Sequence, residues 1–84
     1  MSKNEIYIKI RPIFAEKLMV DEEELEMETD VINGLCPDSL VITEIIMEIE
    51  DEFGLAIADG ELNGLDRICD LVDYLHEKLA FAGR

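Results

Sequence analysis

Ser39 is the residue whose position best suits covalent chemistry. It follows Asp38 at the predicted start of a helix, directly after a long loop, so its hydroxyl should be exposed. Such a serine can be a simple helix-start residue, a nucleophile or the acceptor of a modification. A nucleophile needs an activating base, but the chain has no G-x-S-x-G turn, and its single histidine, His76, lies on a different predicted helix. A modification requires only an exposed serine and a partner enzyme.

Other reactive side chains predict neither catalysis nor metal binding. Cys36 and Cys69 are far apart and outside any C-x-x-C pattern, which favours reduced thiols over a zinc site or a disulfide. The acidic run 21–28 lacks the alternating ligands, the glycine and the terminal glutamate of an EF-hand loop. We therefore expect no metal and no catalytic site, so the chain should not be an enzyme.

Length and composition predict one domain over residues 1–84. Hydrophobic residues make up 49% of the chain and charged residues 33%, which is typical of a soluble globular domain. No apolar run approaches the roughly 20 residues that cross a membrane, and the first residues lack the apolar core of a signal peptide. We expect a cytoplasmic monomer that does not insert into membranes.

The net charge of −14 argues against nucleic acid and anionic membranes and favours basic protein surfaces as partners. Between Leu18 and Asp66 there are sixteen acidic residues and no Lys or Arg, and all seven basic residues lie in the terminal segments. Solubility alone explains acidity in many small domains. A central segment whose charged residues are all negative also predicts a docking surface for basic partners.

The apolar periodicity predicts an all-α fold, a small four-helix bundle of three main helices and one short helix. Residues 6–18 have helical spacing, although Ile6, Ile8 and Ile10 also alternate as in a strand. Pro12 should cause a kink or a late start in this first helix. Residues 20–37 have no period and predict a long loop, which apolar side chains should hold to the core; they are Leu25, Ile32 and Leu35.

The clearest predicted element is a second helix from Ser39 to about Phe53, capped by Asp38 and stopped by Gly54. Asp59 should cap a one-turn helix, and Asp66 should cap a final helix. The apolar stripe of that final helix comprises Ile68, Leu71, Val72, Leu75 and Leu79.

The second helix has two contrasting faces. The predicted core stripe comprises Ile42, Ile46, Ile49 and Phe53, widened by Ile45. The opposite face comprises Leu40, Glu44, Met47, Glu48 and Asp51. Isolated exposed apolar residues often have no function, but an apolar centre with a charged rim is typical of a transient protein interface.

Around Ser39 the sequence resembles the acyl carrier proteins. The similarity rests on Leu35-Cys36-Pro37-Asp38-Ser39-Leu40, on the acidic ending Glu50-Asp51-Glu52-Phe53, and on Asp73-Tyr74-Leu75. The resemblance implies that Ser39 carries 4′-phosphopantetheine, attached covalently from coenzyme A, and that acyl groups are held on it as thioesters. Two positions depart from the family pattern, which commonly has glycine at the place of Cys36 and an acid at that of Val41. Both leave the pathway open among fatty acid, polyketide and related lipid biosynthesis.

The resemblance also implies partners and further site residues. The partners would be a phosphopantetheinyl transferase and basic-surfaced acyl-processing enzymes such as synthases, acyltransferases and reductases. The partner-binding residues would be Asp38, Leu40, Glu44, Met47, Glu48, Glu50 and Asp51. An acyl-chain cavity would be lined by Ile46, Ile49, Phe53, Ile57 and Leu62. The alternatives are a carrier of aminoacyl or peptidyl groups and an acidic binding module without a prosthetic group.

Overall fold

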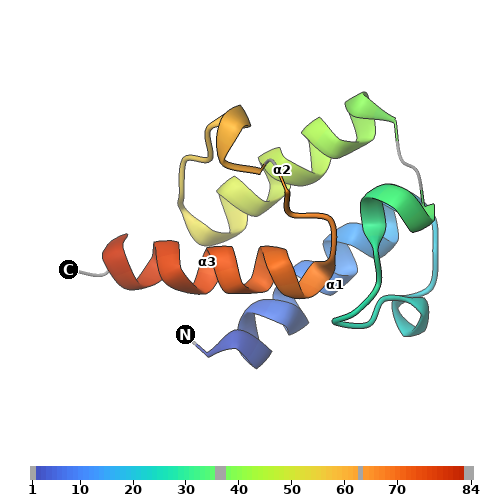
Figure 1. Ribbon diagram of the computed structural model, residues 1–84, viewed down its shortest axis with the longest axis horizontal. Helices are drawn as coiled ribbons and strands as arrows, with labels where there is room; N and C mark the ends of the chain where they lie inside the picture. Colours follow the sequence, from blue (N-terminus) through green and yellow to red (C-terminus); the bar gives the residue numbers. More distant parts are fainter. Residues whose placement is uncertain (1, 36–37, 63, 83–84) are drawn as a thin grey trace.

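A computed structural model of the protein describes residues 2–35, 38–62 and 64–82; within these ranges it leaves out the side chains of Leu35, Asp59, Leu62 and Ala82. Three α-helices form the body of the molecule: α1 (Lys3–Leu18), α2 (Ser39–Phe53) and α3 (Ile68–Ala82) (Figure 1). Short helical turns lie between them: η1 (Glu22–Glu24), η2 (Val31–Leu35) and η3 (Asp59–Leu62). The described residues contain no strand beyond one isolated bridge between Asp30 and Arg67, so the all-α prediction is confirmed.

The helix α1 begins earlier than Pro12 suggested. Ser2 and Glu5 form a capping box, in which the Glu5 N–H donates to Ser2 Oγ at 3.2 Å and the Ser2 N–H donates to Glu5 Oε1 at 3.1 Å. Of the two expected effects of Pro12, a kink or a late start, the late start is wrong, and the helix continues through Pro12. Pro12 cannot donate to the carbonyl of Ile8, but both residues are exposed, so water can satisfy that carbonyl.

The long loop is fastened to the start of α3 by its backbone. The Val31 N–H donates to the Asp66 carbonyl at 2.9 Å, and the Cys69 N–H donates to the Met27 carbonyl at 2.8 Å. Leu25 is fully buried as expected, and its carbonyl accepts a hydrogen bond from the Tyr7 hydroxyl. Val31 is buried in place of the predicted Ile32, which is 38% exposed. Ile32 instead lines a cavity, which leaves it partly exposed. The Leu35 side chain lies outside the described part of the structure.

The predicted bounds of α2 are confirmed, with Asp38 at the capping position and Gly54 in the left-handed region at φ 66°. Two other predicted caps are wrong. Asp59 is the first residue of η3, and the Glu61 carboxylate accepts from the Ala58 N–H at 2.9 Å. The helix α3 begins two residues after Asp66, and the Asp70 carboxylate accepts from the Arg67 N–H at 3.2 Å. In both helices an acid in the first turn accepts a hydrogen bond from the backbone N–H of the residue just before the helix.

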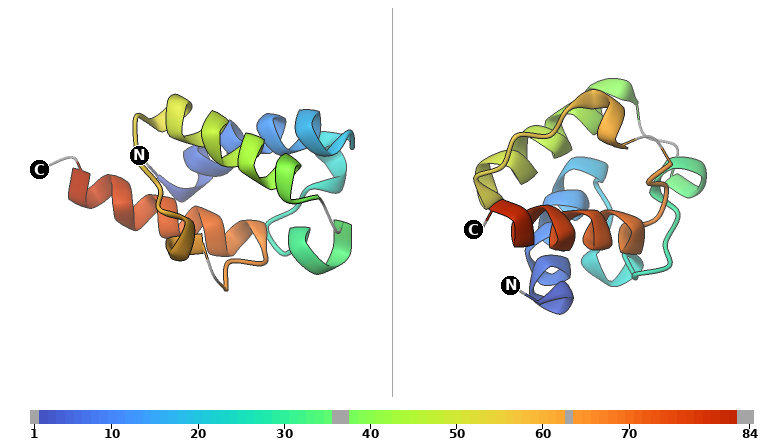
Figure 2. Two further views of the ribbon diagram at one scale, coloured as in Figure 1. Left: turned by 90° about the horizontal axis from the view of Figure 1, so that it is seen from above. Right: turned by 60° about the vertical axis from the view of Figure 1, so that its left-hand side comes forward.

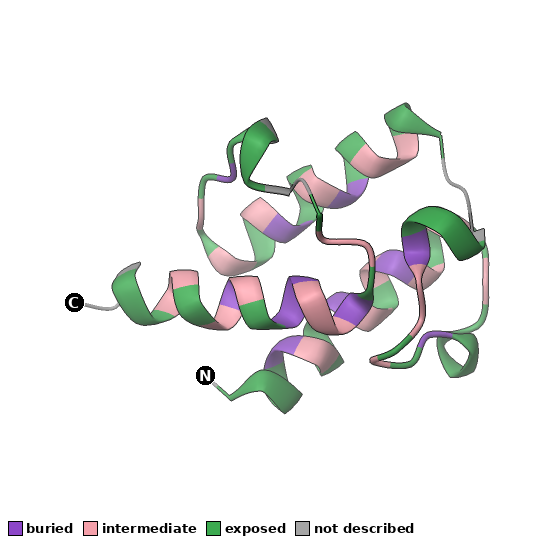
Figure 3. Cartoon of the chain, viewed as in Figure 1, coloured by how far each residue is buried: buried purple, intermediate pink, exposed green. Residues whose placement is uncertain are grey.

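One core joins the three helices, and α1 packs against both α2 and α3 (Figure 2). Buried residues lie on all three α-helices and also in the segments between them (Figure 3). They are Ile6, Ile10, Phe14, Leu25, Val31, Ile45, Ile49, Ile57, Ile68, Leu71, Val72 and Leu75. On α2 the buried centre is Ile45 with Ile49, while Ile42, Ile46 and Phe53 are only half-buried. The predicted stripe is thus shifted toward Ile45, because Ile42 and Ile46 face a cavity.

Candidate functional site

Ser39 is the first residue of α2 and is exposed. Its carbonyl accepts a hydrogen bond from the Thr43 hydroxyl at 3.0 Å, one turn further along the helix. The Asp38 side chain makes no capping hydrogen bond, although its carbonyl accepts from the Ile42 N–H at 3.0 Å. The serine therefore stands at the positive end of the α2 dipole, where a phosphate group is favoured.

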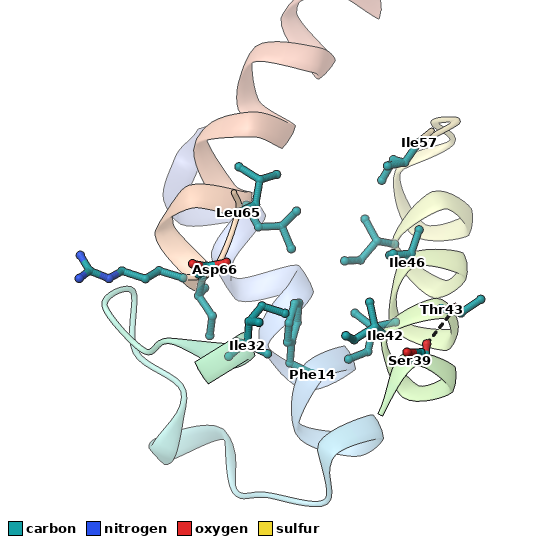
Figure 4. A pocket seen from close by; sticks show the side chains of 15 residues that line it. Phe14, Ile32, Ser39, Ile42, Thr43, Ile46, Ile57, Leu65 and Asp66 are labelled. Carbon is teal, nitrogen blue, oxygen red and sulfur yellow. Dashed lines mark hydrogen bonds between the residues drawn. The ribbon is translucent and has the colours of Figure 1, made fainter. Parts of the chain in front are cut away.

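An apolar cavity of about 400 Å³ opens between α2 and α3, and Ser39 lines one end of it (Figure 4). The other lining residues are Phe14, Val31, Ile32, Ile42, Thr43, Ile45, Ile46, Ile49, Ile57, Leu65, Asp66, Arg67, Ile68 and Leu71. Figure 4 shows Ile42 and Ile46 pointing from α2 into the cavity, with Leu65 and Phe14 on the opposite side. An apolar chain attached near Ser39 would thus have an apolar space directly beside it.

The structure places the sequence-predicted cavity residues unevenly. Ile46, Ile49 and Ile57 are together in the lining. Phe53 packs half-buried against the core outside the described lining. The side chain of Leu62 lies outside the described part of the structure. Sequence reasoning missed the opposite wall, including Phe14, Leu65 and Leu71, because a helical stripe on one element does not reveal which residues face it.

The outer face of α2 carries the predicted mixture of apolar and acidic residues. Leu40 is 70% exposed and Met47 is 58% exposed. Glu44, Glu48 and Asp51 are exposed on the same face. Glu48 lies 3.9 Å from the Lys17 ammonium of α1, so part of its charge is balanced within the molecule.

Glu50 has a contact that the sequence did not reveal. Its carboxylate oxygen Oε2 accepts a hydrogen bond from the backbone N–H of Ile57 at 2.8 Å, and the residue is half-buried. Glu50 was expected at the edge of the partner-binding face. In the structure its carboxylate also binds the segment that follows α2. The glycine stop at position 54 signals that the chain turns back here, which brings residues after the turn within reach of Glu50.

Two other kinds of site find no support in the described ranges. No group of three or more His, Cys, Asp or Glu side chains among them could hold a metal ion. No described helix has the length and apolar character that a bilayer crossing requires.

Comparisons of this chain with a family model and with known proteins agree on one family. Residues 9–75 match the family model described as phosphopantetheine attachment site. The chain is 37% identical to an acyl carrier protein of Thermotoga maritima, covering 93% of this chain and 96% of the relative. It is 38% identical to an acyl carrier protein of Thermosynechococcus vestitus, and the match covers 95% of this chain and 99% of that relative.

A solved structure agrees with these relatives. The solution structure of a proposed acyl carrier protein from Anaplasma phagocytophilum superposes with a TM-score of 0.82 at 26% identity, covering 93% of this chain and 92% of that one. An exposed serine beside an apolar cavity also suits a flexible prosthetic arm that bears an acyl chain. The chain therefore belongs to the phosphopantetheine attachment family and, within it, to the acyl carrier proteins, which hold acyl groups on covalently attached 4′-phosphopantetheine and are not themselves enzymes.

Proposed function

We propose that Ser39 is the attachment residue of 4′-phosphopantetheine and that the protein carries acyl intermediates in fatty acid, polyketide or related lipid biosynthesis. The observation that carries this proposal is the position of Ser39, which is exposed and lines one end of an apolar cavity. When bound, the arm supplies a terminal thiol that holds the acyl group as a thioester. Tethering then raises the effective concentration of that acyl group at a partner's active site.

The cavity is the proposed shelter for the acyl chain. Its walls are mainly isoleucine and leucine side chains, among them Ile46 and Ile49 of α2 and Leu71 of α3. Removing an alkyl chain from water contributes about 0.8 kcal/mol for each buried methylene group. A sheltered chain therefore stabilises the folded protein, and the gain should grow with chain length until the cavity is full.

The outer face of α2 is the proposed docking surface for the phosphopantetheinyl transferase and for basic-surfaced synthases, acyltransferases and reductases. Leu40 and Met47 would give a small apolar contact, and Glu44 and Asp51 would steer basic partners. Asp38 and Glu48 extend the acidic rim, while Glu50 would contribute only from its edge. Docking of this kind releases readily, as a carrier requires, and weakens as salt rises.

Two further expectations belong to this proposal. The single core shared by all three helices supports one domain over residues 1–84, and we propose that this domain acts as a monomer. Val41 is half-buried against that core, so the position where the family commonly has an acid serves packing in this chain. Val41 adjoins Leu40 on the proposed docking helix. An apolar residue in place of an acid there supports partner enzymes that are specific for this carrier.

The test of the proposed cargo uses the protein after its arm has been installed. The holo-protein is offered malonyl-coenzyme A with a malonyltransferase and, in parallel, amino acids with an adenylating enzyme. We expect transfer of malonyl groups and none of aminoacyl groups, measured by intact mass. Transfer of aminoacyl groups alone would instead favour a carrier of amino acids or peptides.

A further inference from the structure

Ile57 lines the end of the cavity that is farthest along α2 from Ser39. Ser39 is at the first residue of α2 and Ile57 follows the last turn, so the two lie at opposite ends of the helix (Figure 4). The fifteen residues of α2 span about 22 Å at the rise of an α-helix. Ile57 is only 9% exposed and belongs to the cavity lining. An acyl chain that enters beside Ser39 would therefore meet Ile57 last.

The backbone around Ile57 belongs to no helix and is held by Glu50. The Glu50 carbonyl accepts the Gly54 N–H and the Leu55 N–H, the latter at 3.1 Å. Its carboxylate accepts the Ile57 N–H at 2.8 Å. A hydrogen bond to an ionised carboxylate is stronger than a neutral one. One residue of α2, Glu50, thus holds both the turn after the helix and the lining residue Ile57.

The next residue has a separate anchor. The Ala58 N–H donates to Glu61, and Glu61 is paired with Lys78 on α3. Loss of the Glu50 side chain should therefore free Ile57 locally without detaching the whole segment between α2 and α3.

We propose that Glu50 is a positioning residue that holds Ile57 as the end wall of the cavity and thereby sets the longest acyl chain the protein can shelter. This inference rests on the proposed function, because it takes the cavity to be the shelter of the chain. It assigns Glu50 a role in cargo length in addition to its place at the edge of the docking face.

The experiment compares acylated forms of the holo-protein that carry butanoyl, hexanoyl, octanoyl, decanoyl, dodecanoyl or hexadecanoyl chains. The melting temperature of each form is measured relative to the unacylated holo-protein. In the wild type we expect the melting temperature to rise with chain length and then to level off. In Glu50→Ala we expect the levelling-off point to move to longer chains, because the end wall yields.

Conservative and matched variants separate positioning from general stability. Glu50→Gln retains an oxygen that can accept the Ile57 N–H, so it should keep the wild-type length limit. Glu52→Ala removes another carboxylate of α2, one whose side chain is 3.3 Å from the exposed Lys9 ammonium, and should also leave the limit unchanged. Hydrogen exchange of the Ile57 amide in the holo-protein should be faster in Glu50→Ala than in Glu50→Gln.

The outcomes distinguish this inference from the proposed function. If the wild type shows a length limit and Glu50→Ala shows the same one, the role of Glu50 is overturned while the shelter stands. If the wild type shows no dependence on chain length, the shelter and this inference both fail. Ile57→Val shortens the end wall directly, so it tests the wall even if Glu50→Ala does not fold. It should lengthen the limit, and an unchanged limit in that variant overturns the inference.

Discussion

Lys78 on α3 and Glu61 in η3 form a bidentate ion pair across seventeen positions of sequence, with Nζ 3.1 Å from Oε1 and 3.2 Å from Oε2. The same carboxylate accepts the Ala58 N–H. The short helix before α3 is thus tied both to its own first turn and to the last helix. Because Ile57 and Leu65 flank η3 and both line the cavity, we expect this pair to stabilise the part of the lining that these two residues form.

The pair predicts a specific dependence of stability on pH. The Ala58 N–H, and then Lys78, lower the pKa of Glu61 from 4.5, and the bond to Glu61 raises the pKa of Lys78 from 10.5. A lowered carboxyl pKa gives stability that is present above the unfolded value and is lost as pH falls through the folded value. A raised ammonium pKa gives stability that is present below its unfolded value and is lost as pH rises through the folded one. The pair should therefore contribute most between about pH 5 and 10.

A comparison of variants isolates this contribution from the relief of negative charge that acid brings to the whole protein. We expect Glu61→Gln to lower the melting temperature at pH 7 and to lower it less at pH 3, because the carboxylate loses charge as pH falls through its lowered pKa. Glu77→Gln, which changes an exposed glutamate on α3, serves as the control. An equal loss in Glu61→Gln at both values of pH would mean that the charge of Glu61 contributes nothing.

The ends of α1 and α2 predict opposite responses to glycine and alanine. Met19 ends α1 in the left-handed region at φ 58° and is 91% exposed, so its side chain adds strain and little packing. Met19→Gly should raise the free energy of unfolding by about 0.5–1 kcal/mol. Gly54→Ala should lower it by about 1 kcal/mol, since Gly54 ends α2 in the same region and no heavy atom lies near its Cβ position. Urea unfolding of both variants measures these changes. A Met19→Gly variant less stable than the wild type would contradict the claim that Met19 strains the backbone.

How far the sequence predicted these features depends on whether the signal was local. The bounds of α2 were predictable because Asp38 and Gly54 adjoin its ends. Asp59 and Asp66 were wrongly taken as caps, because more than one acid adjoins each helix start and the sequence does not show which of them accepts from a free N–H. The bond from Ile57 to Glu50 was not predictable, since the turn that joins them has no period.

The long loop between α1 and α2 was also only partly predictable from the sequence. An aperiodic segment does not indicate which of two adjacent apolar residues faces the core, and Val31 rather than Ile32 is buried. The outer face of α2 was predictable, because helical periodicity alone places Leu40, Glu44 and Met47 together. What periodicity could not show is which acids are already paired within the molecule.

The proposed docking face predicts unequal effects for its acids. Glu48 is partly balanced by Lys17, whereas Glu44 lies one turn closer to Ser39 on the exposed face. Glu44→Ala should therefore reduce turnover by a partner acyltransferase more than Glu48→Ala does, with unchanged helicity. The difference should shrink at high salt, because exposed charges are screened. A larger effect of Glu48→Ala at low salt would contradict this assignment.

The attachment of the arm at Ser39 is tested most directly by intact mass after incubation with coenzyme A and a promiscuous phosphopantetheinyl transferase. The wild type and Thr43→Ala, which removes a neighbouring exposed hydroxyl, should each gain one phosphopantetheine, and Ser39→Ala should gain none. An unmodified wild type, under conditions that modify a control carrier, or a gain that persists in Ser39→Ala would contradict the account.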